Sequence, residues 1–375
     1  MCFVRFVDYA GKGGAMNFVI AAGGTGGHLF PGIAVGEVLV RRGHRVMLLI
    51  SEKEIDALAT KGCTEFRIEK VAGEGLQSKS PLALIRFWLK LQAAKKRCAA
   101  LFADWNPAAV LGMGGFTCFA PIVVGRKREV PTFVHESNAI PGRANRLNSR
   151  YVTRVLLGFE QCRAHFPKAK CEVVGTPIRT ALRLTINKGD ARAAFGLSRE
   201  KTTLLVMGGS QGASGINKRV IEALPSLAGR VQVIHLTGKG DEQSTRDAYG
   251  KAGVVAHVAA FHHAMQEAYS AADIAIARSG AASLTELSHF KLASILIPYP
   301  FAADDHQTAN AQIFHTAGAS VMMQEAEASG TALSRALLEI LNSPTRLEGM
   351  SRKAQSLAPE NAAELVTETI LKFCA

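Results

Sequence analysis

The feature that most constrains how this chain can fold is a pattern that occurs twice. Residues 17–27 read NFVIAAGGTGG and residues 203–212 read TLLVMGGSQG, so each copy is a short apolar run followed by a glycine-rich turn. An apolar run of this length, followed by glycines and then a helical pattern, is typical of a buried strand. The glycines let the turn approach a ligand, and the free N–H groups at the start of the helix favour an anion such as a diphosphate. The repeat therefore predicts two similar domains, each with its own glycine turn.

Further apolar runs alternate with helical patterns in both halves of the chain. The other predicted strands are 45–50, 108–113, 131–135 and 152–157 in the first half, and 231–236, 273–277 and 294–297 in the second. This alternation predicts an α/β fold of two doubly wound, Rossmann-like domains, each a parallel sheet covered by helices. Ligands of two such domains belong in the cleft between them.

The predicted boundary between the two domains lies at Pro177. A chain of 375 residues is too long for one ordinary core. We assign residues 16–177 to the first domain and residues 178–375 to the second, and leave open whether the last helix packs back on the first domain. Met16 directly precedes the first predicted strand. Residues 1–15 are therefore either a leader extension or part of the protein.

The amino-acid composition limits which partners and which kinds of site we expect. The 44 Lys and Arg residues exceed the 31 Asp and Glu residues, and the net charge of +13 favours phosphates, nucleic acid or an anionic membrane surface. A nucleic-acid partner is not expected, because the basic residues form no long run interleaved with aromatics. The seven cysteines are scattered without CxxC pairs, which predicts neither a zinc site nor a disulfide framework and fits a reducing cytosol. No metal and no cofactor is expected, since the sequence has neither a DxD motif nor carboxylates at metal-ligand spacing.

A basic and strongly apolar helix is predicted at residues 80–97, which read SPLALIRFWLKLQAAKKR. At 100° per residue, Arg86, Lys90 and Arg97 fall within about 40° of one another and form a basic stripe. The apolar residues cover an arc broader than one neighbouring helix would bury. Two interpretations remain open: a core helix with a solvated face, or a helix that dips into a membrane interface with its stripe toward anionic lipid. The apolar residues of the membrane interpretation are Leu82, Ile85, Phe87 and Trp88.

Four further motifs accompany the glycine turns in a fixed order. They are HESNAIPGRANR (135–146), GTPIR (175–179), RSGAASLTE (278–286) and AADDHQTANA (302–311). Neither turn is a P-loop, because GxxxxGK[ST] is absent, and no acidic residue ends the second strand in the way that dinucleotide binding prefers. Together with GGTGGH and GGSQGA, the ordered set resembles the MurG family of bacterial glycosyltransferases, and the resemblance extends from Met16 to the C-terminus.

The resemblance implies a GT-B fold and a defined reaction. Members of the family move N-acetylglucosamine (GlcNAc) from UDP-GlcNAc to the C4 hydroxyl of undecaprenyl-diphospho-muramoyl pentapeptide (lipid I), with inversion, and the products are lipid II and UDP. The implied location is peripheral, on the cytoplasmic side of the plasma membrane. Acceptor and membrane contacts are implied for the first domain, and the nucleotide sugar mainly for the second. Contacts with other cell-wall enzymes are left open.

Alternatives from other classes also remain. A related GT-B protein could be a UDP-sugar epimerase or a transferase that acts on another glycolipid. A non-catalytic scaffold that binds nucleotide at a membrane would keep Glu286 and the second glycine turn but would not need His28. The presence of both sets of residues favours the enzyme.

In the first domain, the resemblance assigns the role of general base to His28. A histidine, with an ordinary pKa of roughly 6.5, can accept a proton near neutral pH. The alternative is that His28 only caps its turn. Thr25, Gly26 and Gly27 would present the turn to the acceptor diphosphate, with close helix packing as the alternative. Asn138 would contact the sugar, although an asparagine after a strand is often only a turn residue.

In the second domain, Glu286 is implied to accept hydrogen bonds from the ribose hydroxyls, whereas Ser283-x-x-Glu286 also fits a capping box. Arg179 is implied to neutralise the leaving diphosphate, with an exposed surface arginine as its alternative. Gln307 is implied to contact the GlcNAc hydroxyls, and Asn310 lies on the same helical face. The remaining implied donor contacts are Ser210, Gln211, Gly212, Ala282 and Ser283.

Three positions depart from the commonest family pattern. His306 stands where a second Gln is frequent, Phe116 replaces a frequent Tyr, and AFHHAM (260–265), with His262 and His263, replaces a more acidic sequence. These departures leave the contacts to the uracil and the donor sugar open but do not affect the reaction class. The pair Asp304-Asp305 is expected to form a solvated helix cap.

Overall fold

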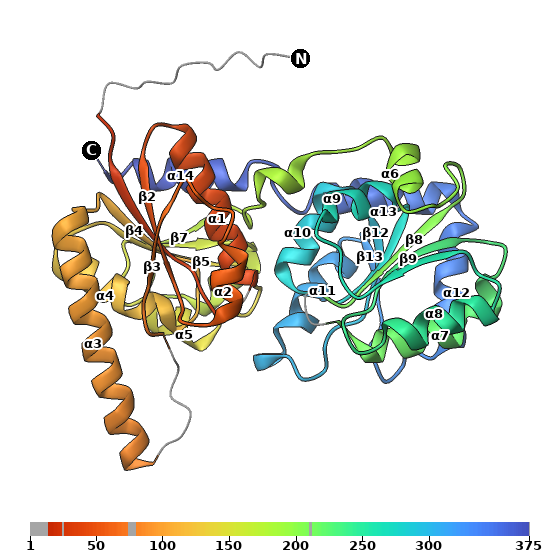
Figure 1. Cartoon of the computed structure of the whole chain (residues 1–375), viewed down its shortest axis with the longest axis horizontal. Helices are drawn as coiled ribbons and strands as arrows, with labels where there is room; N and C mark the ends of the chain where they lie inside the picture. Colours follow the sequence, from red (N-terminus) through yellow and green to blue (C-terminus); the bar gives the residue numbers. More distant parts are fainter. Residues whose placement is uncertain (1–13, 25, 74–79, 210–211, 375) are drawn as a thin grey trace.

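The computed structural model describes residues 14–24, 26–73, 80–209 and 212–374. They form two α/β domains that lie side by side, the first on the left of Figure 1 and the second on the right. Each domain is built on one parallel sheet, with seven strands in the first and six in the second. The two doubly wound domains predicted from the sequence are confirmed.

The first sheet has the strand order β3-β2-β1-β4-β5-β6-β7, which reverses direction between β1 and β4. Its strands are β1 Asn17–Ala21, β2 Arg45–Ile50, β3 Arg67–Lys70, β4 Ala109–Gly112, β5 Thr132–Glu136, β6 Arg154–Leu157 and β7 Cys171–Val173. Its helices are α1 Gly26–Arg41, α2 Glu54–Ala59, α3 Pro81–Trp105, α4 Phe119–Lys127 and α5 Arg143–Asn148, with 3-10 turns at Phe116–Cys118 and Glu160–His165. The carboxyl ends of β1 and β4 form the switch point at which such folds bind ligands.

The second sheet repeats this plan with the order β10-β9-β8-β11-β12-β13. Its strands are β8 Thr203–Met207, β9 Gln232–Leu236, β10 Ala256–Ala259, β11 Ile274–Ala277, β12 Ala293–Leu296 and β13 Ser320–Met322. The helices are α6 Lys188–Ala194, α7 Ser214–Leu227, α8 Glu242–Lys251, α9 Met265–Ala271, α10 Ala281–His289, α11 His306–Thr316, α12 Gly330–Leu341, α13 Pro344–Gln355 and α14 Ala362–Leu371, with 3-10 turns at Thr180–Arg183 and Ala303–Asp305. The strand order again reverses between two neighbours, here β8 and β11.

Side chains of the central strands pack on both faces of each sheet. In β1, Phe18 and Ile20 lie in one apolar cluster, whereas Val19 and Ala21 lie in a second cluster on the opposite face. All four residues are buried. This alternation explains why the sequence of a central strand is an unbroken apolar run: both of its faces are covered by helices.

The last helix joins the two domains. It follows α13 of the second domain but packs on α1 of the first, and Figure 1 shows the chain crossing back over the first sheet. Val366 and Ile370 of α14 are buried in the same cluster as Phe18 and Ile20. The core of the first domain therefore includes residues from the end of the chain.

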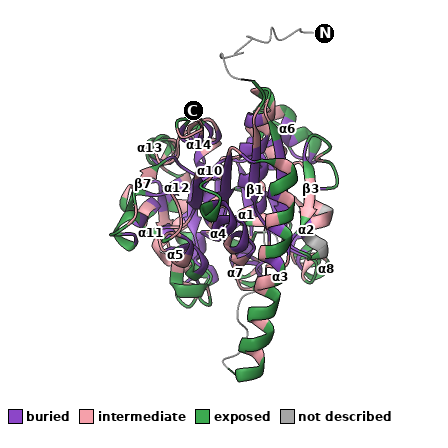
Figure 2. Cartoon of the chain, turned by 90° about the vertical axis from the view of Figure 1, so that its left-hand side faces the viewer, coloured by how far each residue is buried: buried purple, intermediate pink, exposed green. Residues whose placement is uncertain are grey.

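Helix α3 is attached to the domain only by its second half. Cys98 and Phe102 are fully buried, while Leu82 and Trp88 are 59% and 58% exposed. Figure 2 shows the first half of the helix extending below the rest of the domain. Ser80 caps the helix by accepting a hydrogen bond from the Ala83 N–H at 3.3 Å. The core-helix interpretation is thus wrong for the first half of α3, although it holds for the second.

Candidate active site

His28 lies at the switch point of the first sheet. It is the third residue of α1, which begins directly after the turn that follows β1. A Cβ atom on Gly114, just beyond β4, would come within 2.7 Å of the His28 ring, and Gly114 has a φ of +117°. Gly114 therefore has to be glycine for the imidazole to occupy this position. The sequence analysis did not identify Gly114, although the doubled glycine after a strand could have indicated it.

The surroundings of His28 favour its neutral form. Burial lowers the pKa of His28 from its ordinary value, and the charge of His306 acts in the same direction. The carboxylates of Glu136 and Asp56, and a hydrogen bond to the Gly23 backbone, oppose this effect without cancelling it. A neutral imidazole at pH 7 can accept a proton from a bound hydroxyl group.

The first glycine turn is partly filled by the protein itself. The Gly24 N–H donates to Oδ2 of Asp56 at 2.7 Å, and the Ser51 hydroxyl donates to the same oxygen. A Cβ atom on Gly23 would lie 2.6 Å from the Ser51 nitrogen, so close packing accounts for this glycine. Gly26 and Gly27 are the first two residues of α1, where backbone N–H groups have no partner within the helix. Thr25 lies outside the described residues.

The loop after β5 is organised by a buried carboxylate. Glu136 is 3% exposed and accepts from the Asn138 N–H at 2.9 Å, the Asn138 side-chain amide at 3.1 Å and the Gly142 N–H at 3.1 Å. The Asn145 amide adds a fourth hydrogen bond at 2.9 Å. Glu136 thereby fixes the orientation of Asn138. The side-chain oxygen of Asn138 accepts from Asn310 of the second domain at 3.0 Å, so Asn138 is more than a turn residue.

Arg179 lies between the domains and is not an exposed surface residue. Its guanidinium carbon is 3.8 Å from the centroid of the Phe30 ring. Burial lowers the pKa of Arg179, and the charges of Glu286 and Glu37 oppose that effect. The Nε atom is buried and has no hydrogen-bond partner within the described part of the chain. A charged donor in this situation is suited to an anionic ligand.

Glu286 is held by one oxygen. The Tyr269 hydroxyl donates to its Oε2 at 2.5 Å, and burial raises the pKa of Glu286 while Tyr269 and Arg179 counteract the rise. The capping-box interpretation is wrong, because Gly280 is the N-cap of α10 and Ser283 is already its third residue. Ala282 and Ser283 occupy the first turn of the same helix and are half-buried.

Gln307 is oriented by backbone groups at the start of α11. Its Oε1 accepts from the Tyr299 N–H at 3.0 Å and the Ser279 N–H at 3.3 Å, while the Ser279 hydroxyl donates to the Gln307 carbonyl at 2.8 Å. Because the carbonyl end is used, the NH₂ end is the part that can donate to a ligand. Asp305 occupies the N-cap position of α11 with a φ of 53° but makes no side-chain capping hydrogen bond there.

The second glycine turn is tightly packed. A Cβ atom on Gly212 would lie 2.5 Å from the Thr237 carbonyl oxygen, and Gly212 has a φ of +75°. A Cβ on Gly208 would lie 2.4 Å from the backbone nitrogen of Ala213. Ser210 and Gln211, between them, lie outside the described residues. Close packing therefore explains why residues 208 and 212 are glycines, independently of any ligand that the turn binds.

The histidines that depart from the family pattern have protein partners. His262 pairs with Glu267 at 3.0 Å and packs against Phe195, and the His263 ring packs against Phe261. The Nδ1 atom of His306 lies 2.7 Å from the Ala303 carbonyl oxygen.

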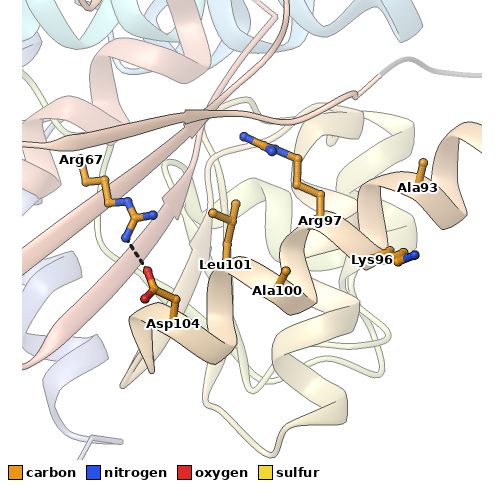
Figure 3. Close-up of a pocket in the computed structure, with 7 residues that line it drawn as sticks. All are labelled: Arg67, Ala93, Lys96, Arg97, Ala100, Leu101 and Asp104. Atoms are coloured by element: carbon orange, nitrogen blue, oxygen red, sulfur yellow. Dashed lines mark hydrogen bonds and ion pairs between the residues drawn. The ribbon is translucent and has the colours of Figure 1, made fainter.

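A groove of about 520 Å³ lies on the outer side of the first domain, between β3 and α3. Figure 3 shows its basic residues, with the Arg67 guanidinium bound to the Asp104 carboxylate at 2.8 Å. Arg97 donates to Oε2 of Glu69 and to the Lys70 carbonyl oxygen, both at 2.9 Å. Of the three residues of the predicted basic stripe, Arg97 is thus bound to the last two residues of β3. None of the predicted substrate-binding residues lines the groove.

The segments 14–24, 26–73, 80–209 and 212–374 bear on two further kinds of site. No three His, Cys, Asp or Glu side chains in these segments form a group that could hold a metal ion. Nor does any helix within them combine the length and the apolar character needed to cross a bilayer.

Two family models match the chain, the glycosyltransferase family 28 N-terminal domain over residues 18–157 and the C-terminal domain over residues 203–366. The UDP-N-acetylglucosamine--N-acetylmuramyl-(pentapeptide) pyrophosphoryl-undecaprenol N-acetylglucosamine transferase of Geotalea uraniireducens is 37% identical over 95% of this chain and 98% of its own length. The protein of the same name from Myxococcus xanthus is 39% identical over 93% of this chain and 91% of its own.

Solved structures give a consistent result. The crystal structure of Acinetobacter baumannii MurG is similar with a TM-score of 0.76 and 28% identity, covering 96% of this chain and 99% of the other. The UDP-GlcNAc 2-epimerase of Neisseria meningitidis, at a TM-score of 0.68 and 15% identity over 95% of this chain and all of the other, shares the fold alone.

Proposed function

Because the chain belongs to the MurG family of glycosyltransferases, we propose that it transfers GlcNAc from UDP-GlcNAc to lipid I in peptidoglycan synthesis. The observation that carries the proposal is the similarity over about 95% of the chain to curated transferases of this name, which includes both domains of the GT-B fold. Residues 16–177 would bind the acceptor, and residues 178–375 would bind the nucleotide sugar.

The geometry of His28 supports a role as general base. The C4 hydroxyl oxygen of the muramoyl sugar attacks the anomeric carbon of GlcNAc, and the bond from that carbon to the diphosphate oxygen breaks. The hydroxyl proton passes to the His28 imidazole, which its surroundings keep neutral. UDP leaves with the electron pair of the broken bond, and the attack from the opposite face yields a β linkage. Gly26 and Gly27 would present N–H groups to the acceptor diphosphate.

Four donor contacts are supported by the positions of the side chains. The guanidinium of Arg179 would stabilise the negative charge of the departing UDP. Glu286 has Oε1 available for the ribose hydroxyls, because Tyr269 binds Oε2. Gln307 would donate through its NH₂ group to a GlcNAc hydroxyl, and Asn138 would approach the sugar from the first domain. The further proposed contacts are Thr25 on the acceptor and Ser210, Gln211, Gly212, Ala282 and Ser283 on the nucleotide.

The exposed half of α3 supports peripheral membrane binding. Leu82, Ile85, Trp88 and Leu89 are each more than half exposed at the projecting end of the helix (Figure 2). Large apolar side chains gathered on one projecting element are typical of an interfacial membrane contact. Phe87 is half-buried, and Arg86 and Lys90 supply positive charge for anionic lipid head groups. The location proposed with this contact is the cytoplasmic side of the plasma membrane, as the family resemblance implies.

The test is UDP release from UDP-GlcNAc by purified protein with a short-chain lipid I. We expect release to depend on the acceptor. His28→Ala should lower kcat by about 10²- to 10⁴-fold, since a general base contributes that much. Glu286→Ala should raise the KM for UDP-GlcNAc by about 10- to 100-fold, the effect of losing hydrogen bonds to a charged acceptor.

Two exposed residues provide matched controls. His165→Ala and Glu339→Ala remove the same side-chain types from the surface and should leave kcat and KM unchanged. If UDP-GlcNAc binds but no acceptor yields UDP, the transferase proposal fails. A changed sugar in the recovered nucleotide would then indicate an epimerase, and an unchanged one a nucleotide-binding scaffold.

A further inference from the structure

Asn310 connects the two domains through all of its polar atoms. It lies on α11 and is completely buried. Its Oδ1 accepts from the Ala139 N–H at 2.8 Å, and its amide donates to Oδ1 of Asn138 at 3.0 Å and to the Ser279 carbonyl oxygen at 3.1 Å. Two of these partners belong to the loop after β5 in the first domain, and the third belongs to the second domain. Asn310 therefore joins segments that are about 170 residues apart in the sequence.

The hydrogen bonds continue beyond Asn310 on both sides. In the first domain, Asn138 is bound to the buried carboxylate of Glu136 at 3.1 Å. In the second domain, the Ser279 N–H donates to Oε1 of Gln307 at 3.3 Å. An unbroken series of side-chain and backbone contacts thus runs from Glu136 to Gln307. It links two residues that the proposed reaction places on the donor sugar, Asn138 and Gln307.

The contact between the two domains near Asn310 also includes apolar side chains, whose packing does not require defined angles. Ala139 lies in the apolar cluster of the second domain, and the Phe159 ring of the first domain meets Phe314 of α11 edge to face at 6.4 Å. Such contacts tolerate small sliding movements, whereas hydrogen bonds require defined distances and angles. The hydrogen bonds of Asn310 therefore add defined distances and angles to this apolar contact.

We propose that Asn310 is a positioning residue of the transferase, which holds Asn138 of the first domain in register with Gln307 of the second. The expected effect of Asn310 on turnover rests on the proposed function. The hydrogen bonds by which Asn310 links the two domains do not depend on it. His306 is one turn before Asn310 on the same face of α11, and its charge influences His28. The alignment of the two domains through Asn310 therefore also sets where His306 of α11 lies relative to His28.

Loss of the Asn310 hydrogen bonds should lower turnover more than it weakens binding of the donor. A misplacement of about 1 Å between reacting groups can cost on the order of 100-fold in rate. We expect Asn310→Ala to lower kcat by about 10- to 100-fold while the Kd for UDP-GlcNAc, measured by calorimetry, changes by less than about threefold. Asn138→Ala should lower kcat as well. The double variant should be little worse than Asn138→Ala alone, because Asn310 acts through Asn138.

A measurement without substrate tests whether the Asn310 hydrogen bonds link the two domains. Hydrogen exchange in peptides that contain Ala139 should be faster in Asn310→Ala, since the Ala139 N–H loses its acceptor. Asn310→Asp keeps that acceptor but not the amide donors, so it should lower kcat while leaving Ala139 protected. If Asn310→Ala does not fold, Asn310→Asp takes its place in the kcat measurement. Gln312→Ala is the matched control, because Gln312 is exposed on the same helix and bonds only Thr316 in the described residues.

The outcomes separate the two proposals. Unchanged exchange at Ala139 in Asn310→Ala, or full additivity of the Asn138 and Asn310 effects on kcat, would overturn the positioning role. If the wild-type protein makes no lipid II, the proposed function fails, and the exchange measurement still decides whether Asn310 ties the domains together.

Discussion

At the scale of single residues, the proposed role of His28 as general base predicts the pH range in which the protein is active. His28 must be neutral to accept a proton, so kcat/KM falls as the pH drops through its pKa. Because burial lowers that pKa, we expect the acid limb of the pH profile below the ordinary value of 6.5. Glu136 and Asp56 raise the pKa of His28, while the charge of His306 lowers it. The neighbouring His135 is itself buried, and its pKa is lowered by that burial.

Two substitutions should move the acid limb in opposite directions. His306→Gln removes a positive charge, so the pKa of His28 rises and the limb moves to higher pH. Asp56→Asn removes a negative charge, so the limb moves to lower pH. The measurement is kcat/KM against pH for both variants and the wild type, and shifts of the same sign would show that another group titrates.

The sequence indicates candidate site residues more readily than the residues that hold them in place. His28 and Glu286 stand in motifs that resemble those of the family, and their roles remain proposals. The partners that position them come from distant segments: Gly114 makes room for the imidazole, and Tyr269 binds one oxygen of Glu286. Neither contact follows from a local pattern, because each depends on how the strands are ordered in the sheet.

At the scale of elements, every strand predicted with its bounds is present, and the four strands without predicted bounds are the outer strands of the two sheets. They are β3, β7, β10 and β13. Central strands are buried on both faces and are recognisable as apolar runs. Edge strands can carry polar and charged residues, as in the sequence RIEK of β3, and they are short. Hydrophobic patterning therefore identifies the middle of each sheet but not its limits.

The exposed half of α3 allows a direct test of membrane binding. Replacing Leu82, Ile85 and Trp88 with serine should weaken binding to vesicles that contain anionic lipid by about 10- to 100-fold, because three apolar side chains no longer leave water. Turnover of a short-chain, water-soluble acceptor should not change, since none of the three residues belongs to the proposed site. Sedimentation with vesicles measures the first quantity and UDP release the second.

The control for this experiment is an exposed apolar residue in the other domain. Val255→Ser replaces a side chain that is 54% exposed on the second domain and should leave vesicle binding unchanged. Equal loss of vesicle binding in Val255→Ser, or no loss in the triple variant, would contradict a membrane contact through α3.

At the scale of the whole molecule, the two domains are joined by more than the segment that connects their sheets. Glu364 of α14 pairs with Arg183 at 2.8 Å, and Glu368 pairs with Arg42 of α1 at 3.1 Å. Asn310 adds a further connection between the two domains. The sequence alone left the position of the last helix open, because an amphipathic helix shows which face is buried but not which domain buries it.

The dependence of the first domain on the last helix leads to a final prediction. Ile370→Ala removes a buried side chain from the cluster that contains Phe18 and Ile20. The cavity should lower the free energy of unfolding of the first domain by about 2–5 kcal/mol. We therefore expect faster hydrogen exchange in β1 and β2, some 320 to 350 residues away in the sequence, and little change in β8 and β9. Ile340→Ala makes the same change in the core of the second domain and should give the reverse pattern. If both variants loosened both sheets equally, the two domains would unfold as one unit, and a dependence on α14 confined to the first domain would be contradicted.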